Sequence, residues 1–461
     1  MTVPASPTRS SNLGGAIAAL WVPIVLVIAA FCMSGYVAIQ HSQEFSPVDE
    51  WVYTDYLIKL PTEGVVHEGE AVGQEALGLM ACDGVTPYGP MGQPCGTAHY
   101  QHSRFPFGGI TSADAYTPAY FALTALFGKA VHQAFGINQL TAWRLSGGVW
   151  LAIAMVLLFA VLRRFGVPRL AGLALGLAVI ASPFSWWTYS YISTDAPSLA
   201  FGLLLLLFAI DGVARRRSLW WLVPISVVAV AFKVTNLLGV GLSVIYVLVA
   251  WVLARVRQRR SDAQSGYDSF ERTDTSVRVA LAAGAAAVAG LATQVCWMAI
   301  RAALAVGTPA SQGIGVPLSA RELASQITNF LPGTIVANVD ISGSTGVAYD
   351  IPQFITAPLS WLCVTGVLGC LAIVRLRSRE APIVLAAAIG ALLFAPLLAV
   401  MLRLVSGSYF PLPPRYGAPV LGAMLLCAGI LIRSRIAIYL VLAYAVALYA
   451  FVLVTAPHYS G

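Results

Sequence analysis

The stretch GGAIAALWVPIVLVIAAFCMSGYVAI, residues 14–39, contains no charged side chain. A helix needs about 20 apolar residues to cross the hydrocarbon core of a bilayer, and this stretch is longer than that. Only one basic residue, Arg9, precedes it, and no Ala-x-Ala cleavage site follows it. We therefore expect a retained membrane helix rather than a removed signal peptide.

The rest of the chain repeats this apolar pattern. Runs that reach or approach the length of a span occur at 140–162, 168–190, 196–213, 218–233, 236–254, 278–305, 355–374, 381–403, 416–432 and 436–456. The composition agrees, because 58% of the residues are apolar, 10% are charged and the mean hydropathy is +0.78. A soluble domain carries about 25% charged residues. The sequence predicts an all-α polytopic membrane protein with about 11 transmembrane helices.

The basic residues predict how the chain is oriented. With the N-terminus in the cytoplasm, 18 of the 27 basic residues fall on cytoplasmic segments: Arg9, Arg163, Arg164, Arg169, Arg215, Arg216, Arg217, Arg255, Arg257, Arg259, Arg260, Arg272, Arg278, Arg375, Arg377, Arg379, Arg433 and Arg435. All six histidines fall on the other side. This asymmetry favours an N-in, C-out orientation. Arginine far outnumbers lysine, as in GC-rich bacterial genomes, so a multi-pass protein of a bacterial plasma membrane is expected.

These assignments divide the chain into seven parts. They are a cytoplasmic N-terminus (1–13), the first transmembrane helix (14–39), a large outer loop with interfacial helices (40–139), transmembrane helices 2–7 (140–305), a second outer loop that is a candidate lid (306–354), transmembrane helices 8–11 (355–456) and an outer tail (457–461). In the second loop, Ser319 and Glu322 form a capping box, and Pro332-Gly333 is expected to end the short helix that follows.

Two neighbouring acids, Asp49 and Glu50, follow the first span on the outer side. Acids after Pro47 are typical of the first turn of a helix. A carboxylate held at the membrane surface is also a candidate general base. Neighbours in a helix point about 100° apart, so at most one of the two acids faces a given site squarely. Asp49 shares its face with Tyr53.

Further charged residues lie at outer helix ends. Asp195 stands before Ala196-Pro197, where it is either a helix N-cap or part of a site. Lys233, Arg415 and Arg144 lie at outer ends of spans, where a cation either reaches toward lipid headgroups or has a function. A lipid-linked phosphate would be the natural partner of such cations.

Two cysteines, Cys82 and Cys95, enclose a polar stretch rich in Gly and Pro. On the outer side of a membrane a disulfide is their expected state. A zinc site made by these two cysteines with His99 and His102 is the alternative.

Several common function classes have no support in the sequence. It contains no Walker loop, no GxGxxG motif before a strand, no HExxH and no GxSxG. The formal net charge of +7 comes from the clusters between apolar runs, so it does not indicate nucleic-acid binding.

The order of these short motifs resembles the GT-C superfamily of membrane glycosyltransferases, which includes polyprenyl-phosphate-sugar-dependent mannosyl- and arabinosyltransferases. The resemblance covers residues 15–255 well and the remainder loosely. The matching residues are Asp49-Glu50, Tyr116-Thr117-Pro118-Ala119-Tyr120 with Phe127-Gly128, Ala142-Trp143-Arg144-Leu145-Ser146, Ser182-Pro183, Thr194-Asp195-Ala196, Lys233-Val234-Thr235 and Arg415-Tyr416-Gly417. Many members have His-Pro-Pro where this chain has Tyr116-Thr117-Pro118.

The resemblance implies roles for these residues. The catalytic candidates are Asp49, Glu50 and Asp195, with Asp49 as the base and Asp195 assisting. The candidates for binding the lipid phosphate are Lys233, Arg144 and Arg415. A divalent cation, Mg²⁺ or Mn²⁺, at Asp49 or Asp195 is the one cofactor that the resemblance suggests. The implied partners are a polyprenyl-phosphate sugar donor, a glycan or glycolipid acceptor and membrane lipids.

The resemblance implies an inverting glycosyltransferase. It would move a mannose- or arabinose-like sugar to a hydroxyl of a cell-envelope acceptor on the outer face of the membrane. A carrier or flippase for lipid-linked glycans, and a membrane scaffold without activity, are the alternatives. A transporter would place ionisable groups near the membrane midplane, whereas the acids here cluster outside the spans. The scaffold and the enzyme differ in whether Asp49 and the candidate cations converge on one pocket.

Overall fold

The protein is helical throughout the part of the chain that its structure describes. The structure is a computed structural model, and it describes residues 13–40, 43–47, 49–86, 88–261, 276–310, 315–337, 353–407 and 409–455. In these ranges helices are joined by turns, and the extended pairs are isolated bridges such as Phe45–Val85. The predicted all-α fold is confirmed.

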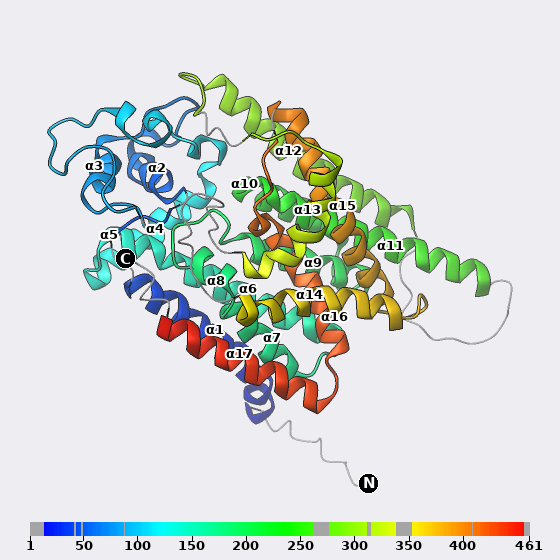
Figure 1. The fold of residues 1–461 in the computed structure, drawn as a ribbon. Coiled ribbons are helices and arrows are strands. Elements are labelled where there is room, and N and C mark those ends of the chain that lie inside the picture. Colours follow the sequence, from blue (N-terminus) through cyan, green and yellow to red (C-terminus); the bar gives the residue numbers. More distant parts are fainter. Residues whose placement is uncertain are drawn as a thin grey trace, which may run out of the picture.

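The helices divide into an outer part and a bundle (Figure 1). The outer part, residues 43–144, contains α2 (Glu50–Glu63), α3 (Gln74–Cys82), η1 (His102–Arg104), η2 (Pro106–Gly109), η3 (Ala113–Ala115), α4 (Pro118–Phe135) and α5 (Gln139–Arg144). The bundle contains α1 (Leu13–Gln40), α6 (Ser146–Arg164), α7 (Arg169–Ile180), α8 (Pro183–Thr188), α9 (Ser198–Val213), η4 (Leu219–Trp221), α10 (Leu222–Phe232), η5 (Val234–Asn236), α11 (Leu237–Ser261), α12 (Val277–Ala303), α13 (Ala320–Gly333), η6 (Thr334–Val336), α14 (Gln353–Ile373), α15 (Ala381–Ser406), η7 (Pro414–Gly417), α16 (Ala418–Leu431) and α17 (Arg435–Thr455).

Eight helices in the described part are long and apolar enough to cross a membrane. They are Leu20–Gln40, Gln139–Arg164, Val234–Gln258, Val277–Ala303, Phe354–Ile373, Ala381–Leu404, Pro414–Leu431 and Arg435–Thr455. Three shorter apolar helices, Arg169–Ile180, Ser198–Val213 and Leu219–Phe232, lie where further spans are predicted. The chain is a multi-pass membrane protein. The number of eleven spans and the N-in orientation stay predictions.

The predicted run 168–190 is not one continuous helix. The helix α7 ends at Ile180, and a second helix, α8, begins at Pro183. Proline has no backbone N–H and fits the first turn of a helix, and the side chain of Ser182 caps this start by accepting from Ser185 N. This break allows the chain to turn before residue 195.

The chain also breaks at Lys233, as the short run 218–233 predicts. Lys233 has extended backbone angles between α10 and η5. The side-chain amide of Asn236 donates to the carbonyl oxygen of Ala229 at 2.7 Å and so satisfies a carbonyl at the end of α10. The backbone N–H of Lys233 donates to the same carbonyl oxygen at 3.2 Å, so the helical ladder of α10 ends at Lys233.

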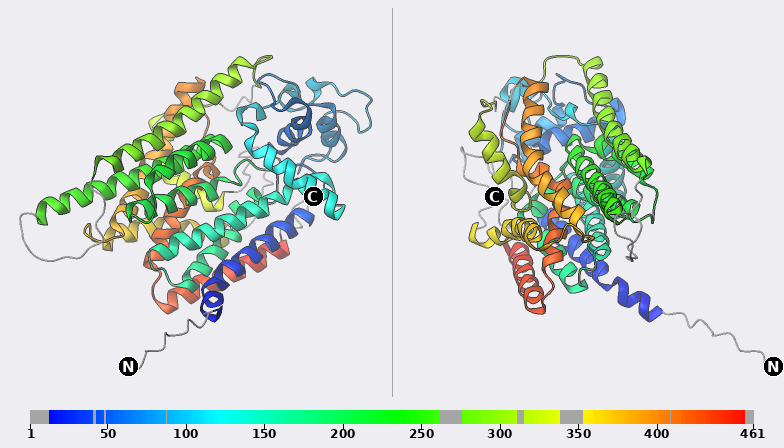
Figure 2. Two further views of the ribbon diagram at one scale, coloured as in Figure 1. Left: turned by 180° about the vertical axis from the view of Figure 1, so that it is seen from behind. Right: turned by 90° about the vertical axis from the view of Figure 1, so that its right-hand side faces the viewer.

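The first and last helices lie side by side, as the two views of Figure 2 show. The hydroxyl of Tyr449 in α17 donates to the carbonyl oxygen of Ala29 in α1 at 3.0 Å. Near the centre, α9 and α16 approach so closely that a Cβ atom at Gly202 would lie 2.0 Å from the carbonyl oxygen of Pro419. Small residues at such crossings are typical of membrane helices.

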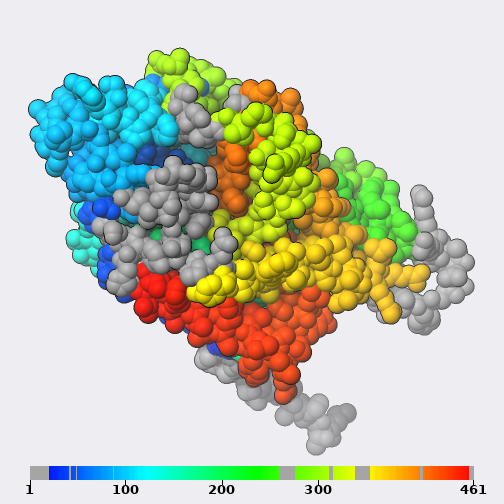
Figure 3. All heavy atoms as spheres, in the orientation of Figure 1, coloured from blue at the N-terminus to red at the C-terminus, as the bar shows by residue number. Residues whose placement is uncertain are grey.

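The outer part lies at the upper left of the space-filling view (Figure 3) and packs against the bundle, for example where Arg301 of α12 pairs with Asp114. A disulfide bond joins Cys82 at the end of α3 to Cys95. Because both sulfurs are bonded to each other, neither is a thiolate, and the alternative zinc site with His99 and His102 does not fit. His102 instead lies with Nε2 at 2.9 Å from the carbonyl oxygen of Val72.

Removing this disulfide is expected to weaken the outer part selectively. The bond closes a loop with a sequence separation of 13, for which chain entropy predicts a stabilisation of about 3 kcal/mol. The variant Cys82→Ala/Cys95→Ala should lose protease resistance within residues 43–144 at a lower temperature than wild type. The matched control is Cys296→Ala, since Cys296 is free and exposed. Equal resistance in all three proteins would contradict this prediction.

The second outer loop contains the short helix that the capping box predicts. The helix α13 begins at Ala320, Ser319 Oγ accepts from the backbone N–H of Glu322, and the helix ends at Gly333. Thr334 Oγ1 then lies 2.9 Å from the carbonyl oxygen of Pro414 and joins this segment to η7. The predicted lid also includes residues 311–314 and 338–352, which lie outside the described residues.

Candidate functional site

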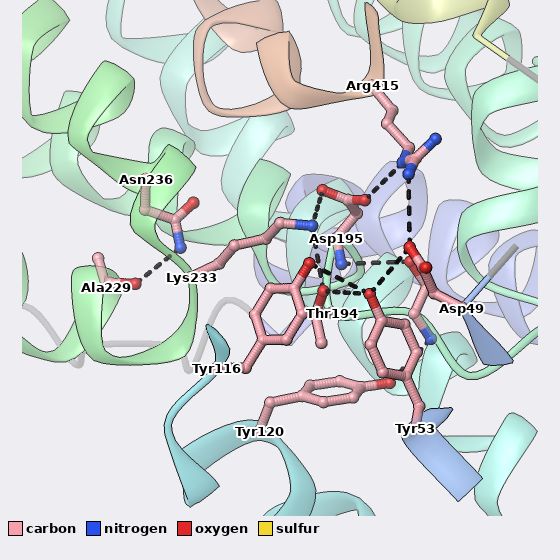
Figure 4. Close-up of polar contacts among 11 residues, drawn as sticks. Asp49, Tyr53, Tyr116, Tyr120, Thr194, Asp195, Ala229, Lys233, Asn236 and Arg415 are labelled. Atoms are coloured by element: carbon pink, nitrogen blue, oxygen red, sulfur yellow. Dashed lines mark hydrogen bonds and ion pairs between the residues drawn. The ribbon is translucent and has the colours of Figure 1, made fainter. Parts of the chain in front are cut away.

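Four charged side chains from four separate segments converge at the end of the bundle next to the outer part (Figure 4). Asp49 precedes α2, Asp195 lies between α8 and α9, Lys233 follows α10, and Arg415 lies in η7. Arg415 Nη2 lies 3.8 Å from Asp49 Oδ2, and Arg415 Nε lies 3.1 Å from Asp195 Oδ2. The structure thus brings together four residues that are predicted as site candidates from distant parts of the sequence.

Each carboxylate oxygen of Asp195 contacts one of the two cations. Lys233 Nζ lies 2.6 Å from Asp195 Oδ1, and Arg415 pairs with the other oxygen. Lys233 Nζ also donates to Thr194 Oγ1 at 3.1 Å. The side chains of Lys233 and Asp195 are almost completely buried, and a buried charge is tolerated only with such partners. Asp195 therefore positions Lys233 and Arg415.

Asp195 is not the cap of the following helix. The helix α9 begins at Ser198, its N-cap position is Pro197, and no side-chain hydrogen bond caps it. The side chain of Asp195 points instead to the two cations. Of the two interpretations of Asp195, the geometry favours a place in a site.

Asp49 is the most accessible of the four charged groups. Its side chain is 28% exposed, compared with 14% for Arg415. Its backbone has φ 60, a left-handed conformation that Asp tolerates better than most residues, and its side chain does not cap α2. Its carboxylate contacts the Tyr53 hydroxyl at 3.4 Å and Arg415 at 3.8 Å. The carboxylate can therefore accept a proton from an incoming group.

The surroundings make Asp49 a stronger base. Burial raises the pKa of its carboxyl above the ordinary value of 3.8, while Arg415 and Lys233 act in the opposite direction. The pKa of the neighbouring Tyr53 phenol lies well above its ordinary range because burial, and then the Asp49 carboxylate, disfavour the phenolate. Tyr53 thus remains a neutral hydrogen-bond donor.

Aromatic rings surround the two cations. Lys233 Nζ lies 5.5 Å from the centroid of the Tyr116 ring and 5.1 Å from that of Tyr416. The guanidinium carbon of Arg415 lies 5.3 Å from the ring of Trp187 and 5.4 Å from the ring of Tyr416. Trp187 is not among the candidates predicted from the sequence, although it lies in the aromatic run Trp186-Trp187-Thr188-Tyr189-Ser190-Tyr191, which is the signal that could have indicated it.

Glu50 and Arg144 do not join this group. Arg144 Nε and Nη2 donate to the two Glu50 oxygens at 2.8 Å each, and both side chains are completely buried. Glu50 also accepts from Ser46 N at 2.7 Å and Ile192 N at 2.9 Å. These placements do not fit the predicted roles of Glu50 in catalysis and of Arg144 in phosphate binding. The pair instead joins the segment that carries Asp49 to the segment that leads to Asp195.

The donor set does not fit a divalent cation. In the described part of the chain, no group of three or more His, Cys, Asp or Glu side chains could hold a metal ion. The two carboxylates that meet here, Asp49 and Asp195, are accompanied by the cations Lys233 and Arg415, which would repel Mg²⁺ or Mn²⁺. The divalent cation expected at Asp49 or Asp195 stays a prediction from the resemblance.

Comparisons with known proteins find similar chains among the solved structures. No protein-family model matches the sequence, and no curated protein matches it. The chain is similar to the solved structure of ArnT from Cupriavidus metallidurans in the apo state, with 19% identity and a TM-score of 0.46 over 90% of this chain and 59% of that chain. ArnT bound to undecaprenyl phosphate matches with 17% identity and a TM-score of 0.41 over 91% and 60%.

A third similar structure is the oligosaccharyltransferase AglB from Archaeoglobus fulgidus, with an inhibitory peptide and a dolichol-phosphate. It has 13% identity and a TM-score of 0.45 over 96% of this chain and 56% of that chain. The superfamily of these proteins is GT-C. At such identities the likeness concerns the fold alone, and we take no residue role from it. The chain spans less than two thirds of the length of these similar proteins.

Proposed function

We propose that this chain is an inverting glycosyltransferase that moves a sugar from a polyprenyl-phosphate donor to an acceptor hydroxyl on the outer face of the membrane. The observation that carries the proposal is the convergence of an accessible carboxylate, Asp49, with two cations, Lys233 and Arg415. A scaffold without activity has no need to bury such a group of charges.

In the proposed chemistry Asp49 is the base, and Lys233 and Arg415 bind the leaving phosphate. The acceptor hydroxyl oxygen attacks the anomeric carbon, and Asp49 takes the hydroxyl proton. The bond between the anomeric carbon and the phosphate oxygen breaks, and its electron pair goes to the lipid phosphate. Lys233 and Arg415 stabilise the negative charge that develops there. Attack from the side opposite the leaving phosphate inverts the anomeric centre.

Position and burial support this assignment of roles. Asp195 lies between the two cations, and Asp49 lies beside Arg415, with its carboxylate 3.8 Å from the guanidinium (Figure 4). Asp195 pairs with one N–H side of each cation, so each cation has further N–H groups that can donate to another oxygen ligand. The side chain of Arg415 is 14% exposed. We propose a mannose- or arabinose-like sugar and a glycan or glycolipid acceptor of a bacterial cell envelope.

Removing the charge of Lys233 is expected to slow transfer. The variant Lys233→Met should lower the transfer rate by about 10²–10³-fold, because one of two groups that stabilise the leaving phosphate is lost. Lys233→Arg should retain more activity. The control Lys129→Met changes an exposed lysine of α4 and should have no effect. Rates are measured with labelled polyprenyl-phosphate mannose and arabinose, and equal rates for Lys233→Met and Lys129→Met would contradict the phosphate role.

The raised pKa of Asp49 predicts a pH dependence. Asp49 accepts a proton only when it is ionised, so transfer should fall as the pH is lowered through its pKa. Because that pKa lies above 3.8, the fall should occur at a higher pH than for an ordinary aspartate. The profile of kcat/KM against pH measures this midpoint. A flat profile down to pH 4 would remove Asp49 as the base.

A further inference from the structure

A second feature of the site is a run of buried polar side chains without protein partners. Within the described part of the chain, five polar atoms of α8 and the turn after it make no hydrogen bond: Ser185 Oγ, Trp187 Nε1, Thr188 Oγ1, Tyr189 Oη and Ser190 Oγ. None of these residues is more than 4% exposed. They are five of six consecutive residues, 185–190.

Such a concentration is uncommon in a folded protein. Folded proteins leave only a few buried polar groups unpaired per hundred residues, because each unpaired group loses its hydration without compensation. Apolar side chains of similar shape would fill the same space at lower cost. The polar atoms of this run, 185–190, therefore indicate a partner that is not part of the chain.

The backbone of this segment is held firmly on both sides. Ser34 Oγ donates to the carbonyl oxygen of Tyr189 at 2.6 Å, and Ile192 N donates to Glu50. Gly147 lies against the Tyr189 carbonyl so closely that a Cβ atom would be 2.2 Å from its oxygen. The main chain at Tyr189 and Ile192 is therefore fixed against α1, α2 and α6.

The segment borders the proposed phosphate site. The Trp187 ring lies 5.3 Å from the guanidinium carbon of Arg415. A few residues later, Thr194 Oγ1 contacts Lys233 Nζ at 3.1 Å, and Asp195 pairs with both cations. A group attached to a phosphate held by these cations would lie next to Trp187, the member of the run that contacts Arg415.

We propose that the run 185–190 binds the hydroxyl groups of the donor sugar; this inference rests on the proposed function. Four of its five unpaired atoms are hydroxyls, which both donate and accept, and the fifth is an indole N–H. None carries a charge, so the set suits a neutral, polyhydroxylated ligand rather than a carboxylate or an amine. Ordered water is the competing partner.

The test compares lipids with and without a sugar. Thr188→Val and Tyr189→Phe each remove one unpaired oxygen and little else. Binding of polyprenyl phosphate, polyprenyl-phosphate mannose and polyprenyl-phosphate arabinose is measured with the full chain in detergent. At least one sugar lipid should bind each variant about 10-fold more weakly than wild type, which is the loss expected for one hydrogen bond. Binding of the sugar-free lipid should not change.

Two controls separate this result from damage to the fold. Thr188→Ser restores a hydroxyl and should recover binding. Ser226→Ala removes another buried, unpaired hydroxyl, seven residues before Lys233 and about 10 Å away along α10, and should have no effect. Since the removed atoms have no protein partner, the melting temperature of the apo variants should equal or exceed that of wild type.

Each outcome decides the inference. Equal losses for the sugar-bearing and sugar-free lipids, or no loss for either, overturn it, and the second result would leave water as the partner of the run. Wild type that binds the sugar lipids no more tightly than polyprenyl phosphate also overturns it. If the variants lose selectivity for the sugar while wild type transfers no label to any acceptor, the sugar site stands and the proposed transferase activity fails.

Discussion

Replacing Asp49 by asparagine is expected to lower kcat by about 10²–10⁴-fold, because the variant keeps the shape of the side chain but cannot take a proton. The KM for the donor lipid should change little, since Asp49 is not among the groups that receive the phosphate in the proposed chemistry. This split between kcat and KM distinguishes a base from a residue that binds the donor.

Stability provides the control for this prediction. The pKa of Asp49 is raised, so the folded protein favours its protonated form, and its charged form costs free energy near neutral pH. Asparagine removes that cost, although it also removes the 3.8 Å contact between two charges. The melting temperature of Asp49→Asn should therefore be close to that of wild type. A large fall in melting temperature together with a loss of kcat would point to misfolding rather than to a lost base.

Removing the guanidinium of Arg144 is expected to destabilise the protein by about 3–5 kcal/mol. The variant Arg144→Met leaves the Glu50 carboxylate completely buried without its charged partner. It also leaves the carbonyl oxygen of Glu44 without the donor at 2.7 Å. Thermal unfolding in detergent measures the effect.

A double variant and a surface variant make this test specific. Glu50→Gln/Arg144→Met removes both charges and should recover part of the lost stability, because no unpaired charge remains buried. Arg321→Met changes an exposed arginine of α13 and should leave the melting temperature unchanged. If Arg144→Met were as stable as Arg321→Met, the ion pair would not hold the two segments together.

The membrane helices could be predicted from the sequence because their cause is local. Residues 14–39 contain no charge, and the structure has a helix there from Leu13 to Gln40. The break inside the predicted run 168–190 depends on Ser182 and Pro183, whose capping role a search for apolar length does not detect. Hydropathy shows which segments enter the membrane, while side-chain capping decides where the helix stops.

The four charged residues of the site could be predicted from the sequence, but the contacts between them could not. Asp49, Asp195, Lys233 and Arg415 each look unusual in their own sequence neighbourhood, so each could be selected as a candidate. Arg415 and Asp195, however, are separated by 220 residues, and nothing local shows that they meet.

The lack of local information about long-range contacts also explains why Glu50 and Arg144 are predicted as site residues, although they pair with each other away from the site. Arg144 and Glu50 are 94 residues apart, and as isolated charges at outer helix ends they look the same as the others. Only the packing of α5 against the segment before α2 shows that each neutralises the other. Long-range contacts therefore decide which charges stabilise the fold and which face a substrate.

The most direct test of the account is sugar transfer in membranes that contain equal amounts of wild type, Asp49→Asn or Glu75→Gln. Glu75 is an exposed carboxylate of α3 in the same outer part, so its variant controls for the loss of an outer negative charge. Labelled polyprenyl-phosphate mannose or arabinose is supplied, and the label in membrane glycans is measured. We expect transfer by wild type and Glu75→Gln and almost none by Asp49→Asn. Equal transfer by all three proteins, or by none of them with either donor, would contradict the account.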